Sequence, residues 1–99
     1  FRSRRHVAHF VAVSADANRL RQRAAHLRGL ADAIEESPVM RLDRHGDVDT
    51  WRGRRPDLCR ATLAANQRQL HEAADRLRWH ASRFEQQAEV LDVVARRAG

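Results

Sequence analysis

Two long segments of the chain share one seven-residue repeat, and this repeat restricts the fold more than any other feature. In the first segment a small or aromatic residue recurs every seven positions, and a large apolar residue recurs three positions later. The two sets are Phe10, Ala17, Ala24, Ala31 and Val13, Leu20, Leu27, Ile34. Such spacing places both sets on one face of an α-helix, at positions a and d of a coiled coil. The alternation of apolar and polar residues that a strand requires is absent.

The second segment has the same heptad repeat, with large residues at the d positions and Ala at the a positions. Its members are Leu63, Leu70, Ala74, Leu77, Ala81, Phe84, Ala88 and Leu91. Gln67 is the polar exception among the a positions. Small residues let two helix axes approach closely, and large residues interlock beside them. The two sets together therefore predict the seam of a tightly packed antiparallel helix pair.

Helix-breaking residues concentrate between the two segments. Pro38 restricts Ser37 to extended conformations, two Gly follow, and Pro56 suits the first turn of a new helix. The sequence predicts an all-α, two-helix antiparallel hairpin with a helix at about 7–36, a loop at about 37–54 and a helix at about 55–97. We expect one domain, 1–99, with residues 1–6 as a flexible arm. The loop is expected either to include a short helical turn around Val39 to Leu42 or to be mobile.

The charge pattern fits a solvated helix surface better than a nucleic-acid interface. The net charge is +6 and all 19 basic residues are Arg, but 13 acidic residues are interleaved with them. Arginines cluster around the loop and could contact phosphates, so a basic helical nucleic-acid-binding protein is an alternative function. The cluster comprises Arg41, Arg44, Arg52, Arg54, Arg55 and Arg60. Four neighbouring Asp residues weaken the field of this cluster. We therefore do not expect nucleic acid as a partner.

Residue patterns that support catalysis or metal binding are not found. His6 and His9 are three residues apart and could lie on one helix face, but they lack a third ligand nearby. The single Cys59 pairs with no His at a zinc spacing. No Gly-rich phosphate loop is present, and two helices enclose little volume in which to exclude water. We expect no catalytic residues, no cofactor and no metal. No apolar run is long enough to span a membrane.

Trp51 and Gly53 form a Trp-Arg-Gly turn motif just before the second helix. A W-x-G motif between two heptad arms of this length resembles the WXG (ESAT/Esx-like) family of small helical hairpins in type VII secretion systems. The resemblance covers about residues 10 to 95 and implies a hairpin that dimerises into a four-helix bundle and contacts the secretion machinery. The chain departs from the family in its longer loop. It also has no Tyr, so the family's signal of a Tyr and an acid four residues later is missing.

A second apolar set predicts a partner interface and a dimer of hairpins. Its members are Val7, Val11, Leu30, Trp79, Val90, Val93 and Val94. The partner is expected to be a second copy or a related hairpin, and the function a non-enzymatic protein–protein interaction module. We expect the chain in the cytoplasm, or exported through a type VII system without a cleaved signal peptide. Because the chain begins with Phe1, the N-terminal targeting hairpin of a longer toxin or effector is a further alternative.

Overall fold

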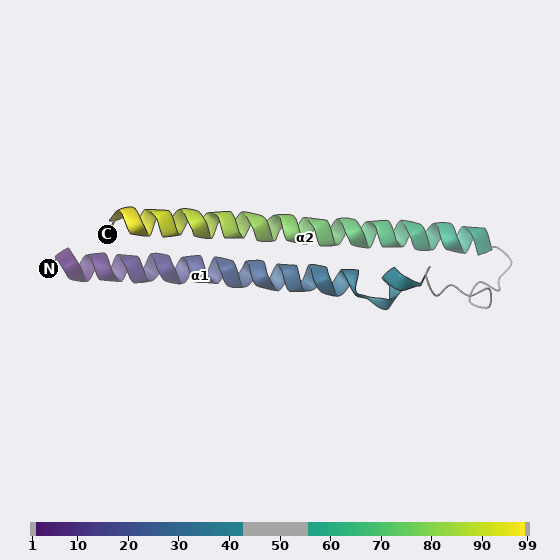
Figure 1. Cartoon of the computed structure of the whole chain (residues 1–99), viewed down its shortest axis with the longest axis horizontal. Coiled ribbons are helices and arrows are strands. Elements are labelled where there is room, and N and C mark those ends of the chain that lie inside the picture. The colour runs from purple at the N-terminus through teal and green to yellow at the C-terminus, as the bar shows by residue number, and fades with distance from the viewer. Residues whose placement is uncertain (1, 43–55, 99) are drawn as a thin grey trace.

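The computed structural model describes residues 2–42 and 56–98, which form two long helices and one short helical turn. The elements are α1 (Arg2–Glu35), the 3-10 helix η1 (Pro38–Arg41) and α2 (Pro56–Ala98). Helices α1 and α2 run side by side in opposite directions, and both termini lie at the same end (Figure 1). The predicted all-α hairpin is therefore confirmed.

Helix α1 begins five residues before the predicted start. Residues 2–6, which we expected to be a flexible arm, continue the helix. They contain neither Gly nor Pro, and Arg has a high helix propensity. At the other end, Ser37 adopts φ −63° and ψ 146°, an extended conformation that terminates the helix before Pro38.

The segment after α1 forms the short helical turn that was one of the two expectations for the loop. Its Met40 amide donates a hydrogen bond to the Ser37 carbonyl at 3.0 Å. From α2, the Gln67 side-chain amide donates to the Val39 carbonyl at 2.9 Å. This contact explains the polar residue at an a position of the seam, because Gln67 meets the backbone of η1 at the level where α1 has already ended.

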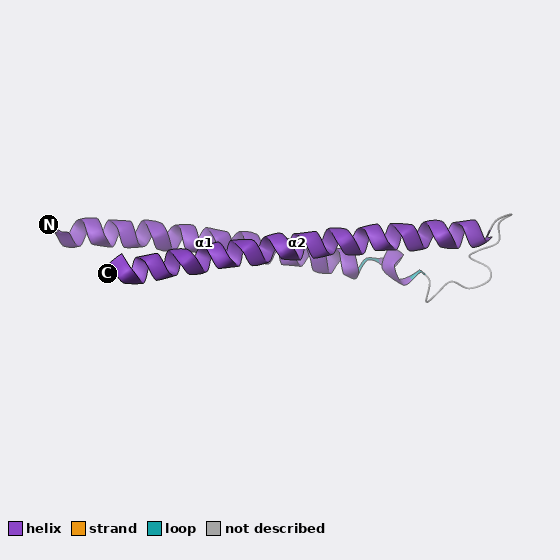
Figure 2. Ribbon diagram, turned by 90° about the horizontal axis from the view of Figure 1, so that it is seen from above, coloured by secondary structure: helices purple, strands orange, loops and turns teal. Residues whose placement is uncertain are grey.

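The interior of the helix pair consists almost entirely of alanine. Seven Ala side chains and one Leu are buried: Ala17, Ala24, Ala31, Leu63, Ala74, Ala81, Ala88 and Ala95. The seven buried Ala residues all occupy a positions, and the two helices approach most closely along the line that these positions form. The two helices cross at a shallow angle (Figure 2).

The hairpin is long and thin, and its described helices form a single pair. Its extents are 78 × 15 × 14 Å and its radius of gyration is 22.3 Å. A compact chain of this length would have a radius of gyration of about 13 Å. Most side chains of both helices therefore remain within reach of solvent or of another molecule.

Gly29 offers a simple test of the helix assignment in α1. It lies on the outer side of the helix, and a Cβ built there would meet nothing within 4 Å. Gly29→Ala should stabilise the protein by about 0.5–1 kcal/mol, because Ala loses less backbone entropy in a helix. Thermal unfolding followed by circular dichroism measures the gain. An unchanged or lower melting temperature would argue against a continuous helix through residue 29.

Candidate interaction surface

Cross-helix ion pairs close one edge of the hairpin. The pairs join residues spaced by sevens on both helices: Arg21 with Asp92, Arg28 with Glu85, and Arg78 with Glu35. We call this line of six e-position residues the ion-pair edge. The three pairs define one antiparallel register, which brings Ala24 to the level of Ala88 and Ala31 to the level of Ala81. Exposed pairs add little net stability, but they disfavour other registers.

The pairing at this edge is dense enough to affect ionisation. The Arg28 guanidinium meets Glu85 at 3.1 Å and 2.5 Å, which lowers the pKa of that carboxyl. Glu35 accepts from His71 Nδ1 at 2.8 Å and from Arg78 at 3.4 Å, and these hydrogen bonds hold its pKa below the ordinary value. Both carboxylates therefore remain charged and paired over the physiological pH range.

The opposite flank of the seam is open. Around the circumference of each helix, the positions that face the partner helix follow the order e, a, d, g. The ion pairs lie at e, so the d residues are on the opposite side of the buried a positions. Leu63 is buried, and the other large d residues described there are only half-buried: Val13, Leu20, Leu27, Ile34, Leu70, Leu77, Phe84 and Leu91. Among the side chains that the structure describes, no large one is fully buried. We call the surface formed by these d residues and the neighbouring g and c positions the open face.

Two grooves lie on the open face, one lined mainly by α1 and the other mainly by α2. A groove of about 520 Å³ has Leu27 and Phe84 as its apolar floor. A second, of about 450 Å³, is built in the same way on Leu20 and Leu91. Each floor takes one residue from each helix, so the grooves depend on the hairpin register.

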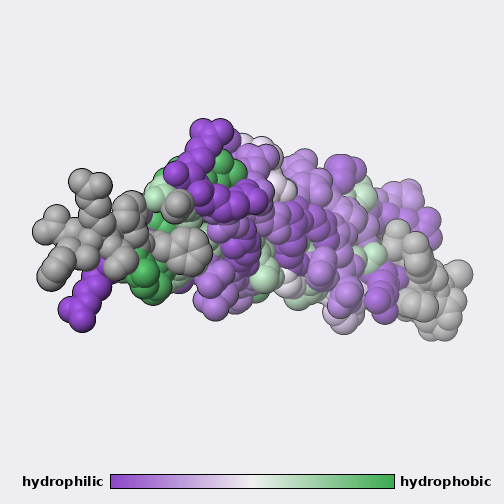
Figure 3. All heavy atoms as spheres, turned by 60° about the vertical axis from the view of Figure 1, so that its left-hand side comes forward, coloured by the Kyte–Doolittle hydropathy of each residue, from purple (hydrophilic) through white to green (hydrophobic). Residues whose placement is uncertain are grey.

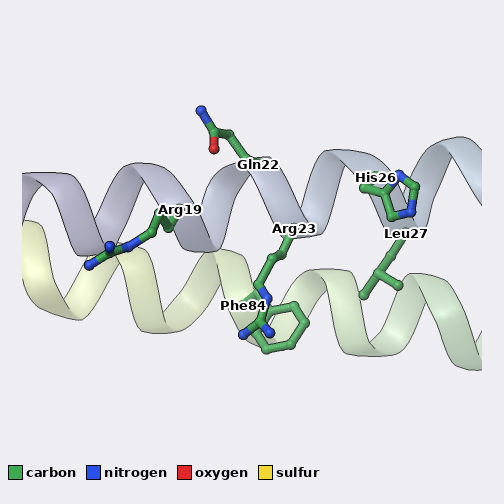
Figure 4. A pocket seen from close by; sticks show the side chains of 6 residues that line it. All are labelled: Arg19, Gln22, Arg23, His26, Leu27 and Phe84. Carbon is green, nitrogen blue, oxygen red and sulfur yellow. The ribbon is translucent and has the colours of Figure 1, made fainter.

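Arginine side chains border these grooves. The Arg23 side chain extends from α1 toward the Phe84 ring, and the Gln22 side chain points away from that ring (Figure 4). The Arg23 guanidinium carbon lies 5.6 Å from the Phe84 ring centroid, and that of Arg83 lies 5.6 Å from the Trp79 ring. The Phe84 ring thus places one cationic group beside an apolar floor, and the Trp79 ring places the other on the outer side of α2.

The g and c positions make the rim of the open face basic. Exposed arginines at these positions are Arg19, Arg23, Arg76, Arg83 and Arg97, accompanied by His9, His26 and His80. Among the described residues, Asp16 is the one acid at a g or c position, and it is paired with Arg19. The e and b positions hold seven of the acids: Asp32, Glu35, Asp57, Asp75, Glu85, Glu89 and Asp92. The two flanks of the hairpin therefore differ in charge.

The predicted partner set is divided between these flanks. Leu30, Val90 and Val94 occupy g or c positions of the open face, with exposed fractions of 43%, 60% and 45%. Val7 and Val11 are equally exposed but occupy e and b positions of α1, on the ion-pair side. The remaining two residues, exposed Trp79 and half-buried Val93, lie at f positions on the outer side of α2. Hydrophobic side chains gather toward the end of the hairpin that carries both termini (Figure 3).

Other predicted residues fall outside the described part of the chain. These are Trp51, Gly53 and the loop arginines 44, 52, 54 and 55, while for Phe10 only the backbone is described. Cys59 is exposed at the start of α2. Within residues 2–42 and 56–98, no three His, Cys, Asp or Glu side chains converge as a metal site would require. In the same ranges, neither long helix is apolar enough to cross a bilayer.

Sequence reasoning missed the basic rim, although the signal is present in the heptad frame. Assigning Arg and His to g and c, and the acids to e and b, requires only the printed sequence. What the sequence did not show is that the e positions pair with each other across the hairpin while the g positions stay open.

No family model, curated protein or solved structure matches the chain.

Proposed function

We propose that this protein is a non-enzymatic interaction module that uses the open face to bind another helical protein. The observation that carries the proposal is the incomplete burial of the large d residues, above all Leu20, Leu27 and Phe84. A helix pair normally buries its large seam residues and leaves small ones near the surface. Here the Ala residues are buried, whereas the large d residues other than Leu63 are only half-buried and four of them line open grooves. A further helix layer would therefore complete the core.

A four-helix bundle is the simplest assembly of this kind. The exposed area of the chain is 8035 Å², against about 5,800 Å² for a compact protein of the same mass. The excess of roughly 2,200 Å² is more than the roughly 800 Å² that one partner contributes to a standard interface, so the hairpin has surface to spare for one. The partner is a second copy of the chain or a related hairpin, and the hairpin acts through this surface without catalysing a reaction.

Within this proposal, we favour a subunit of the WXG type. The support is a Trp-x-Gly motif in the segment that joins two long antiparallel heptad arms. The chain would remain cytoplasmic alone and leave the cell only with a partner that carries the export signal. Expression in a host with a working type VII system, with and without the genomic neighbour, tests this assignment. Secretion of the lone chain would contradict it.

The interaction proposal is tested by two matched substitutions. Val90→Asn removes an apolar side chain from the rim of a groove on the open face, whereas Val11→Asn removes an equally exposed one from the ion-pair side. Because Val and Asn have similar helix propensities, neither change should unfold the hairpin. Analytical ultracentrifugation of the chain, purified at native stoichiometry with its copurifying partner, should show that only Val90→Asn weakens the assembly. A monomer at micromolar concentration without a partner would refute the proposal.

A further inference from the structure

The basic rim limits which molecule can cover the open face. If two copies met through this face, a two-fold axis would bring each rim against the same rim. Arg23 and Arg83 would then face other arginines, and the one acid of the described rim, Asp16, is already paired within its own helix. Like charges brought together at a desolvating interface disfavour association. The charge of this face therefore opposes a homodimer built on it.

The shape of the face points to a helix as the occupant. The floor residues Leu20 and Leu27 are one heptad apart on α1, and Leu91 and Phe84 match them on α2. This spacing is the one that the side chains of another helix fill in coiled-coil packing. A bilayer would first meet the residues that border the floor. Apart from Val90, these are polar or charged, and they include Arg19, His26 and Arg83.

We propose that the open face binds an amphipathic helix of a different chain whose apolar stripe is flanked by Asp or Glu. The inference rests on the proposed function and adds the chemistry of the partner. The stripe would fill the two grooves, and the flanking carboxylates would pair with the arginines of the rim. Arg23 and Arg83 are held in place over aromatic rings, so they are available to a carboxylate without a large loss of side-chain freedom.

The test uses two synthetic helical peptides of about four heptads with the same Ala and Leu stripe. One carries Glu at all flanking positions and the other carries Lys. Like-charge repulsion keeps each peptide from pairing with itself at neutral pH. Fluorescence anisotropy with the full chain should show that the Glu peptide binds about tenfold tighter or more, and that this preference shrinks as salt is added.

Charge variants of the chain locate the preference. The double variant Arg23→Glu, Arg83→Glu should bind the Lys peptide better, and Arg23→Gln, Arg83→Gln should lose the preference without reversing it. The control Arg68→Glu, Arg96→Glu has the same change in net charge at exposed b positions on the other flank, and should keep the preference for Glu. Thermal melts of all variants establish that each hairpin is folded.

The outcomes separate this inference from the proposed function. If the chain forms an assembly that Val90→Asn weakens, but binds both peptides equally or not at all, the acidic partner is wrong and the interaction module stands. A homodimer held by the open face would also overturn the inference. So would binding of phosphatidylserine vesicles or DNA, lost in Arg23→Glu, Arg83→Glu, without binding of the Glu peptide. A chain that never associates would refute both proposals.

Discussion

Replacing Ala24 by Leu should destabilise the hairpin by about 3 kcal/mol, the upper part of the range for overpacked cores. Ala24 is fully buried on the line of closest approach, at the level of Ala88. A Leu there has no space unless the two helices separate, and separation would remove the neighbouring Ala contacts as well. For a domain of this size, the melting temperature should fall by roughly 15 °C.

The matched control for this experiment is Ala25→Leu. Ala25 is the next residue of the same helix but is exposed at a b position. The same change there should alter stability by no more than about 0.5 kcal/mol. Circular dichroism melts of the two variants and the parent provide the comparison. Equal melting temperatures for Ala24→Leu and Ala25→Leu would show that the helices do not meet along the alanine line.

Leu27→Ala should have the second-largest effect, a loss of about 2 kcal/mol in the isolated hairpin. This is the low end for truncation of a core Leu, because Leu27 is only half-buried beside Phe84. When a partner covers the open face, the same substitution should cost more, since the side chain then loses a complete apolar environment. Urea unfolding with and without the partner measures both values.

Leu30→Ala is the control, because this Leu is 43% exposed at the neighbouring g position. Its truncation should change the stability of the isolated hairpin by about 0.5 kcal/mol or less. A larger loss at Leu30 than at Leu27 would mean that the seam runs through g instead of d, and the open face would have to be redrawn.

Much of the fold could be predicted because it depends on short-range periodicity. A heptad repeat needs only the geometry of one helix to define the face that will be buried, so Ala17 and Ala81 could be assigned to it without knowledge of a partner segment. The restriction that Pro38 places on Ser37 is equally local, and α1 ends at Glu35, within one residue of the predicted end. The start of α1 was less predictable, since the N-terminal residues have no breaker and no clear cap.

The candidate surface depended on the tertiary structure, because its features arise between residues far apart in the chain. The seven-residue repeat alone permits several registers, and the pairing of Arg28 with Glu85 selects one of them. That register places the ion pairs on the side of the small a residues and leaves the large d residues open. It also separates Val11 from Val90, which hydrophobicity alone had assigned to one interface. The sequence by itself determined two helices, their apolar faces and the break between them. The tertiary structure decided which flank is closed, because only the pairing of two helices distinguishes one side of the seam from the other.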